Sequence, residues 1–217
     1  MRGAFAVVGA GPGLGAAAAR RFGREGYPVG LIARGAERLG EIAAGLISES
    51  VTTATESADV TDAKSLTVAL DALRERLGPI EVVLFSPRPN LEWIKPVLDT
   101  APSDIESALA LNVVAAATVA RAVVPDMRHQ GYGTLLFTTG GAAVEPHRDR
   151  AVSGIAYAAE SAYTRMLHDT LAADGVHAAQ VTIVGPIGPG ARHEPDEVAE
   201  ELWRLHTTRD QPLLVLR

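Results

Sequence analysis

Cysteine is absent from the 217 residues of this chain, and lysine occurs only twice, at Lys64 and Lys95. Without cysteine the chain has no disulfide, no thiolate metal site and no thiol nucleophile. Aromatic residues make up only 5%, and 26 acidic residues against 20 basic ones give a net charge of −6. A negative chain without a basic stripe is poorly suited to nucleic acid, so no nucleic-acid partner is expected.

The chain also lacks the patterns of membrane and metal-binding proteins. We find no apolar run long enough to span a bilayer and no signal-peptide pattern at the start. The six histidines show no metal-ligand spacing, so we expect no metal. These absences predict a cytoplasmic protein with no membrane partner. A length of 217 residues, 47% of them hydrophobic, suits one globular domain over residues 1–217.

Strand-like and helix-like segments alternate along the whole chain. Most expected strands are continuous apolar runs, which is typical of buried parallel strands, and they cover 5–9, 29–33, 51–57, 82–86, 134–138, 178–184 and 213–216. One helical repeat between them stops at Gly78, and a longer one starts at the capping box Ser103-x-x-Glu106 and runs to Pro125. The pattern predicts an α/β fold with a single doubly wound, Rossmann-type parallel sheet of about seven strands and helices on both faces.

A glycine-rich turn follows the first apolar run. Residues 8–15 read Val-Gly-Ala-Gly-Pro-Gly-Leu-Gly and lead into an alanine-rich helix start. Glycine permits the backbone angles of a tight turn and lets a phosphate approach the main chain, while the helix N-terminus holds the anion. An ordinary strand-to-helix turn stays open as the alternative. The expected cofactor-binding residues here are Gly9, Gly11, Pro12, Gly13, Leu14 and Gly15.

The end of the second expected strand indicates which dinucleotide is bound. NAD-binding folds usually have an acidic residue there for the ribose hydroxyls, but this chain has Ala33 followed by Arg34. A guanidinium pairs with a 2′-phosphate. We therefore expect NADP(H) as the preferred cofactor, with NAD(H) possible. The alternative is that Arg34 is a solvated residue at the start of a helix.

Several short motifs, in order along nearly the whole chain, resemble the short-chain dehydrogenase/reductase family. The first is the Gly-x-x-x-Gly-x-Gly spacing of the glycine turn. Asp59-Val60 resembles the family's adenine-contacting pair, Asn112 its helix-distorting asparagine, and Tyr157 the start of its Tyr-x-x-x-Lys helix. The resemblance also implies cofactor contacts after the fourth and sixth strands, at Ser86, Pro87, Arg88, Pro186 and Ile187.

Two catalytic positions depart from the family pattern. Ser161 stands where the resemblance implies the catalytic lysine, and Gly140 stands where it implies the serine. Thr139 is the candidate to supply the missing hydroxyl, beside Tyr157 as proton donor and Asn112 as a structural and relay position. An unassisted tyrosine has a pKa of about 10, so it stays a phenol near neutrality and favours reduction over alcohol oxidation.

Three functions remain open at this stage. The first is an NADP(H)-dependent oxidoreductase that reduces a carbonyl of an unknown small molecule. The second is a catalytically silent NADP(H)-binding relative that acts as a sensor or partner subunit, and the third is a non-redox enzyme on the same scaffold. The chain is short after residue 187, so we expect little or no substrate lid. The Ala- and Val-rich helix at 103–125 has little polar face, which predicts a homodimer or homotetramer.

Overall fold

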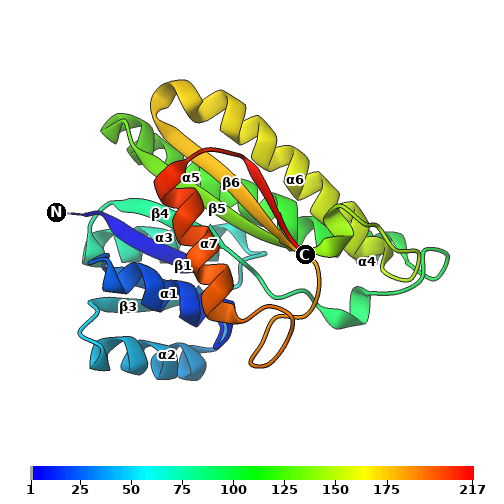
Figure 1. Ribbon diagram of the computed structural model, residues 1–217, viewed down its shortest axis with the longest axis horizontal. Coiled ribbons are helices and arrows are strands. Elements are labelled where there is room, and N and C mark those ends of the chain that lie inside the picture. The colour runs from blue at the N-terminus through cyan, green and yellow to red at the C-terminus, as the bar shows by residue number, and fades with distance from the viewer. Residues whose placement is uncertain (1) are drawn as a thin grey trace.

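The structure is a computed structural model that describes residues 2–217. Within them, seven parallel strands form one sheet in the order β3-β2-β1-β4-β5-β6-β7 (Figure 1). The strands are β1 (Ala4–Val8), β2 (Val29–Ala33), β3 (Thr53–Ser57), β4 (Ile80–Phe85), β5 (Gly133–Gly140), β6 (Val176–Ile183) and β7 (Leu213–Leu216). The predicted doubly wound, Rossmann-type sheet is confirmed.

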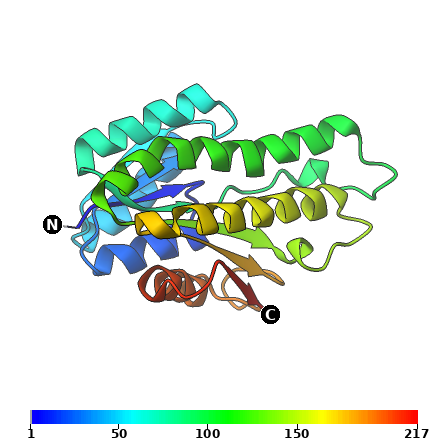
Figure 2. The same cartoon turned by 90° about the horizontal axis from the view of Figure 1, so that it is seen from above.

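Helices cover both faces of the sheet. One face carries α1 (Leu14–Arg24), α2 (Ala36–Ser48) and α7 (Pro195–Thr208), and the other carries α3 (Ala63–Leu77), α5 (Ala115–Gln130) and α6 (Ala151–Leu171). Figure 2 shows α3, α5 and α6 on one side of the strands and α1 and α7 on the other. The remaining elements are η1 (Leu91–Trp93), α4 (Pro102–Leu109), η2 (Ala110–Val114), η3 (Gly141–Ala143) and η4 (Ala172–Asp174).

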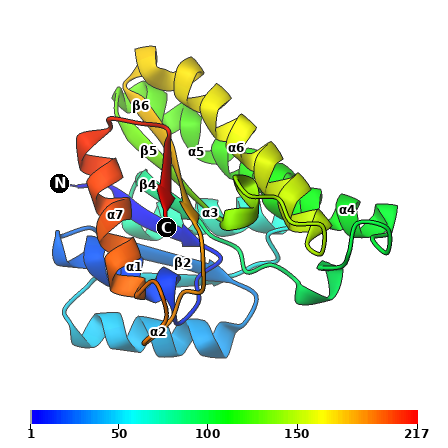
Figure 3. The ribbon, with the colours of Figure 1, turned by 45° about the vertical axis from the view of Figure 1, so that its right-hand side comes forward.

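The order of the strands places a crevice next to β1. The chain builds β2 and β3 on one side of β1, then crosses over and adds β4 to β7 on the other side. The loops after β1 and β4 therefore part from each other, and ligands of open α/β sheets bind at such a point, beyond the carboxyl ends of the strands. Figure 3 shows α4 standing out to one side of the sheet, beyond these strand ends.

The third helix forms as its sequence predicts. Asp62 caps α3 by accepting hydrogen bonds from the backbone N–H groups of Lys64 and Ser65, at 3.0 and 3.2 Å. The helix stops at Gly78, whose φ of +89° favours glycine. Between these ends, Leu66, Leu70 and their neighbours at helical spacing enter the core against the sheet.

The long helix differs from its prediction at both ends. It begins at Pro102, and Asp104 accepts a 3.1 Å bond from the N–H of Ala101, so the capping box predicted two residues further on, at Ser103 and Glu106, is wrong. At the other end it continues past Pro125 to Gln130 and stops at Gly131, which has a φ of +67°. Proline removes one backbone donor, and the burial of apolar side chains on either side of it outweighs that loss.

Residues 102–130 form one helix that is long and apolar enough to cross a membrane by length and composition. The expectation that no such run exists was therefore wrong. In this fold 44% of its most apolar window is buried, with Val119 and Met127 packed on the sheet. Its outer face is not apolar throughout, because Arg121 and Arg128 are exposed. Packing in the core accounts for the buried part of this apolar composition, and the oligomer stays a prediction.

Candidate active site

The glycine-rich turn joins β1 to α1 and lies against the end of β4. Gly9 has a φ of +93°, and a Cβ there would stand 2.6 Å from the carbonyl oxygen of Ser86. A Cβ at Gly15, in the first turn of α1, would stand 3.1 Å from Cα of Ala10. These two glycines are required by the fold itself, because a side chain would strain the turn or push it apart.

The middle of the same turn faces open space. A Cβ at Gly11 or Gly13 would meet no atom within 4 Å, and Pro12 between them is exposed. Leu14 then begins α1, and no side chain caps that end of the helix. Backbone N–H groups at an uncapped helix N-terminus bind phosphate. The cradle at Gly11 and Gly13 therefore fits the pyrophosphate of a dinucleotide.

Arg34 directly follows β2, and its side chain is exposed. The segment after β3 runs beside it, since the Ser57 hydroxyl donates to the Arg34 carbonyl oxygen at 3.0 Å. In this segment the carboxylate of Asp59 accepts two bonds from Thr61, at 2.9 and 2.7 Å, while Val60 is buried. These bonds, and then the charge of Arg34, lower the pKa of Asp59. Arg34 and Asp59 thus lie together, on the side of the crevice where the adenosine end of a dinucleotide is expected.

The residues after β4 lie between the glycine turn and β5. The N–H of Ser86 donates to the last residue of β1 at 2.9 Å, and its hydroxyl accepts a 2.6 Å bond from Thr138. Pro87 packs against the glycine turn, where a Cβ on the first glycine would stand 2.7 Å from Pro87 Cα. Arg88 follows and is exposed. All three predicted residues therefore border the crevice.

Pro186 and Ile187 belong to the loop 184–194, which joins β6 to α7 without a helix of its own. The loop folds back on itself, because the N–H of His193 donates to Pro186 at 3.2 Å and Ile187 pairs with His193 in an isolated bridge. The imidazole of His193 is buried, with Nε2 3.0 Å from the carbonyl oxygen of Val184. This histidine holds the loop against the end of β6 and is not exposed to the crevice.

Tyr157 lies on α6 with its ring against the end of β5. A Cβ at Gly140 would stand 3.2 Å from Cε2 of Tyr157. The tyrosine and the position expected for the family's serine therefore face each other across the strand end. The short distance also means that a serine side chain at Gly140 would press on the tyrosine ring.

Asn112 lies in η2, a π-helical turn between α4 and α5. Its side chain is buried, and Nδ2 donates to the carbonyl oxygen of Ala108 at 2.8 Å. π-turns inside α-helices frequently occur at functional sites. The helix is thus distorted at the residue for which the resemblance implies a distortion.

A small hollow lies between α4, α6 and the loop after β4. Polar and apolar groups share its lining, among them Asn90, Trp93, Ile94, Asn112, Ser153 and Tyr157. No charged residue belongs to this lining. Concave sites with apolar walls and a few polar groups are typical of small-molecule binding, and this hollow has a lining of that type.

Thr139 does not line this hollow. Its hydroxyl is buried under α6, 3.1 Å from the Thr182 hydroxyl, and it accepts a 2.9 Å bond from Nε2 of Gln180. The same Gln180 nitrogen donates at 2.8 Å to Ser161, whose hydroxyl donates to the carbonyl oxygen of Tyr157. The residue at the lysine position is therefore tied into a buried hydroxyl and amide cluster, and Thr139 belongs to that cluster.

Glu160 is fully buried on α6, one turn after Tyr157. Within residues 2–217 neither of its carboxyl oxygens has a hydrogen-bond partner. Burial without a partner raises the pKa of Glu160 well above its usual range and favours the neutral acid. Burial, above all, raises the pKa of Tyr157, while Arg150 and a side-chain bond with Ser153 oppose this. The phenol therefore stays protonated throughout the neutral range.

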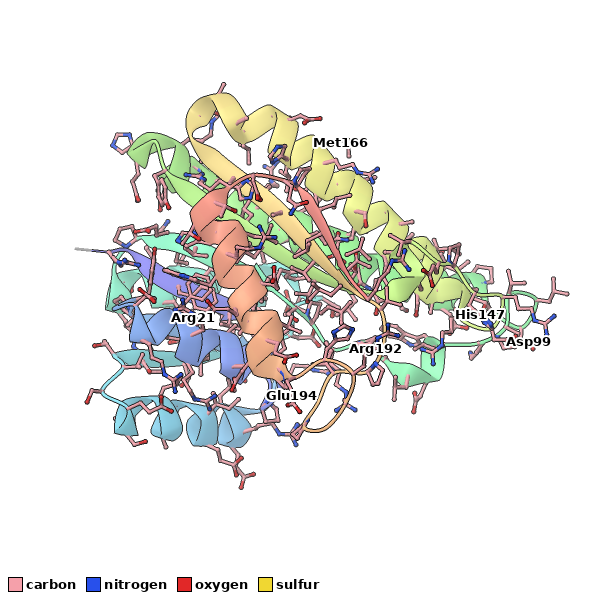
Figure 4. All side chains as sticks on the ribbon, viewed as in Figure 1. Arg21, Asp99, His147, Met166, Arg192 and Glu194 are labelled. Carbon is pink, nitrogen blue, oxygen red and sulfur yellow. The ribbon has the colours of Figure 1, made fainter. Side chains whose placement is uncertain are left out.

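Lys95 and His147 are two further groups that could act near a cofactor, but neither lies at the hollow. Nζ of Lys95 binds Oδ2 of Asp104 at 2.8 Å, so this amine is paired within the outlying α4 region. His147, in the loop before α6, is exposed. Figure 4 shows it near Asp99 at the far end of the molecule. Neither residue belongs to the lining of the hollow.

Sequence reasoning missed three residues that shape the site: Ser153, Glu160 and Gln180. Ser153 comes one helical turn before Tyr157, so the i, i+4 spacing could have placed it beside the phenol. Gln180 interrupts an apolar strand, and Glu160 interrupts an alanine-rich helix. A polar residue inside a buried run signals a built polar contact or a functional group.

The comparisons with known proteins agree with this geometry. The model of the short chain dehydrogenase family matches residues 4–194, and the chain belongs to that family. An uncharacterized oxidoreductase of Staphylococcus epidermidis is 29% identical over 180 residues, which cover 83% of this chain and 75% of that protein. Sulfoacetaldehyde reductase 2 of Chromohalobacter salexigens is 30% identical over 181 residues, 83% of this chain and 70% of that protein. The chain is therefore a member of an oxidoreductase family.

Solved structures of low identity share the fold over almost the whole chain. An alcohol dehydrogenase from Thermococcus sibiricus, complexed with 5-hydroxy-NADP, has a TM-score of 0.85 at 24% identity and covers 100% of this chain and 97% of its own. L-Sorbose reductase from Gluconobacter frateurii, complexed with NADPH and L-sorbose, has a TM-score of 0.89 at 20% identity, with 100% and 95% covered. A short-chain oxidoreductase from Pseudomonas aeruginosa, described as having an atypical catalytic center, has a TM-score of 0.90 at 16% identity, with 99% and 95% covered.

Proposed function

We propose that this protein is an NADP(H)-dependent reductase of a carbonyl group in a small molecule, with Tyr157 as the proton donor. The observation that carries the proposal is the position of Tyr157. Its ring packs on the end of β5, and its side chain lines an uncharged hollow next to the crevice at the carboxyl ends of the strands. A nicotinamide cofactor is supported by the family and by neighbours solved with NADP or NADPH.

The chain's own residues fit the phosphates of that cofactor. The open cradle at Gly11 and Gly13 would hold the pyrophosphate through backbone N–H groups. The exposed guanidinium of Arg34 would bind the 2′-phosphate. An acidic residue at this position would repel that phosphate. Ser86 and Pro186, at the ends of β4 and β6, would border the nicotinamide end. When bound, the cofactor supplies a hydride.

Tyr157 would supply the proton that accompanies reduction. Its raised pKa keeps the phenol protonated, so that it can donate to a carbonyl oxygen placed in the hollow. Asn112 and Ser153 line the same hollow and would orient the substrate by hydrogen bonds. Neither a lysine nor any other cation replaces the family's lysine at position 161, so removing a proton from an alcohol is disfavoured and reduction is the expected direction.

A second candidate function is a catalytically silent NADP(H)-binding protein that serves as a sensor or partner subunit. It is favoured by the two missing catalytic groups, at Gly140 and Ser161, and by the hydrogen bonds that tie Ser161 to Gln180. In this alternative the glycine turn still binds the cofactor, but the hollow beside Tyr157 no longer supports a reaction.

Calorimetric titration with NADPH and NADH, followed by absorbance assays with aldehydes, ketones and quinones, tests the proposal. We expect tighter binding of NADPH and loss of NADPH absorbance with at least one carbonyl compound. Tight binding without turnover on any substrate would favour the silent relative. Product formation without net change of cofactor would indicate a non-redox enzyme, and equal affinities would contradict the NADP(H) preference.

A further inference from the structure

Trp93 forms part of the wall of the hollow beside Tyr157. It is the last residue of η1, and its side chain packs against a small apolar cluster of α4 and α6 that consists of Ala108, Val152 and Ala156. Two of these residues, Ala108 and Val152, line the hollow as well. The side chain of Trp93 is only partly buried. The indole therefore offers apolar surface to a group that enters the hollow.

The rest of the wall has the same apolar character. Pro89, Ile94 and Leu111 contribute to it, from the loop after β4 and from η2. Ile94 packs on the same small cluster as Trp93, and Leu111 is buried in the main core. Removing apolar surface from water stabilises a complex roughly in proportion to the area covered. A ligand with an apolar group therefore gains affinity from this wall.

The polar groups of the hollow are all neutral. Ser153 and Tyr157 supply hydroxyls, and Asn90 and Asn112 supply amides. Part of this capacity is already used, because Oδ1 of Asn90 accepts a 3.1 Å bond from the N–H of Glu92. The remaining groups can bind a carbonyl oxygen, but none of them supplies a counter-charge for an ion.

Charged side chains border the lining along the chain without belonging to it. Lys95 directly follows Ile94, and its Nζ lies 2.8 Å from Oδ2 of Asp104. Arg88 and Arg150 are exposed to water and lie outside the lining. Solvent and salt screen such exposed charges. A charged group that entered the hollow would lose its hydration without meeting a counter-ion in the wall.

We propose that the substrate is a neutral carbonyl compound with an apolar group, such as an aromatic ring, beside its carbonyl, and that Trp93 binds this apolar group. The inference rests on the proposed reductase function of the same hollow. The phenol of Tyr157 binds the carbonyl oxygen while the indole packs against the apolar group. Aromatic rings pack favourably on one another in offset or edge-to-face arrangements, so an aryl aldehyde or ketone fits this description. Trp93 is then a specificity residue and takes no part in hydride or proton transfer.

The turnover test varies the apolar group and the charge separately. NADPH oxidation is measured with benzaldehyde beside acetaldehyde, which lacks the ring. It is also measured with benzoylformamide beside benzoylformate, which has nearly the same shape but a carboxylate next to the reacting carbonyl. The unmodified protein should prefer benzaldehyde over acetaldehyde and the amide over the acid, each about 10-fold or more in kcat/KM.

Variants of η1 assign this preference to one residue. Trp93→Ala should raise KM for benzaldehyde about 10- to 100-fold and change KM for acetaldehyde much less, because only the larger substrate packs on the indole. Trp93→Phe keeps an aromatic wall and should retain most of the affinity. Leu91→Ala is the matched control, since Leu91 is an exposed apolar residue of the same short helix that lies outside the lining.

Tryptophan fluorescence tests the same site without turnover. The chain has only two tryptophans, and the second, Trp203, lies on α7 and packs on the opposite face of the sheet. In Trp203→Phe the emission therefore reports on Trp93 alone. Benzamide and benzoate, which differ in charge but hardly in shape, are titrated into this variant saturated with NADP⁺. We expect a saturable change with benzamide and at least about 10-fold weaker binding of benzoate. Trp93→Phe, which keeps Trp203, should show no change with either compound.

The outcomes distinguish this inference from the proposed function. If nothing is reduced but benzamide binds at Trp93 more tightly than benzoate, the reductase function fails and the neutral, apolar site stands. If carbonyl compounds are reduced but the acid is used as well as the amide, the site is refuted and the reductase function stands. The same holds if Trp93→Ala changes KM for benzaldehyde no more than Leu91→Ala does. If neither turnover nor a fluorescence change at Trp93 is found, both are refuted. The fluorescence arm leaves Trp93 in place, so it decides the matter even if the alanine variant does not fold.

Discussion

The two halves of the sheet follow the short-chain dehydrogenase pattern to different degrees. The half built by residues 4–85 keeps the glycine turn, an open phosphate cradle and a polar rim at Arg34. The half built by residues 133–183 keeps the tyrosine but has Gly140 and Ser161 in place of the expected serine and lysine. Binding of a dinucleotide and chemistry on a substrate depend on different strand ends, so one can be retained while the other changes.

The altered half is not simply stripped of polar groups. Gln180 joins three hydroxyls between α6 and the sheet, and Glu160 is buried on α6 with no hydrogen-bond partner among the described residues. In the first half the buried groups are almost all apolar, and the polar ones lie at the rim. The buried polar cluster near Tyr157 therefore replaces a cationic environment by a neutral one, and this replacement favours a protonated phenol.

The largest effect on the first half is expected from filling its cradle. A Cβ at Gly11 meets no atom within 4 Å, and the φ of this residue lies outside the left-handed region. Gly11→Ala should leave the free energy of unfolding nearly unchanged but weaken NADPH about 100-fold or more, because the methyl group occupies the space of the phosphate. Gly40→Ala, also in open space but on α2, is the control. Calorimetry that shows full NADPH affinity in Gly11→Ala would mean that the phosphates bind elsewhere.

A smaller and more selective effect is expected at Arg34. Arg34→Gln should weaken NADPH about 10- to 100-fold and leave NADH nearly unchanged, because only NADPH carries the 2′-phosphate. Arg24→Gln, an exposed arginine at the other end of α1, serves as the matched control. The measurement is the ratio of the two dissociation constants in each variant. An unchanged ratio in Arg34→Gln would remove the basis for the NADP(H) preference.

The smallest effect concerns the stability of the altered half. The pKa of Glu160 is raised in the folded protein, so its contribution to stability is complete below the ordinary pKa of about 4.3 and is lost as the pH rises toward the folded value. Glu160→Gln replaces the ionisable carboxyl with a neutral amide, so the variant does not lose this stability as the pH rises. The variant should gain up to about 1.4 kcal/mol of unfolding free energy over the unmodified protein for each pH unit in that window. Urea unfolding at several pH values measures it, with exposed Glu41→Gln as a flat control. A difference that does not change with pH would contradict a neutral Glu160.

Local chemistry explains why the fold could be read from the sequence more fully than the site. Apolar runs and turn residues determine strands such as β2, whose predicted bounds of Val29 and Ala33 are confirmed. The long helix was misjudged at Pro125, because tertiary packing outweighs the missing donor of a single proline. The roles of the predicted site residues stay predictions.

The inner polar cluster could not be predicted for a different reason. Thr139 was expected near the reacting position, but its hydroxyl bonds to Gln180, which is 41 residues away along the chain. No local pattern reports such a contact, since it depends on the register between β5 and β6. The packing of Tyr157 against the end of β5 has the same origin in tertiary structure.

The central claim is that Tyr157 alone supplies the proton in a site where Ser161 and Gly140 stand at the positions expected for a lysine and a serine. The most direct measurement is the single-turnover rate of NADPH oxidation by the unmodified protein, by Tyr157→Phe and by Tyr163→Phe, a control on the same helix. Tyr157→Phe should lower the rate at least about 100-fold without changing NADPH affinity, because only the proton donor is removed. Tyr163→Phe should leave both quantities unchanged. Full turnover by Tyr157→Phe would show that the proton comes from another group and would contradict this account.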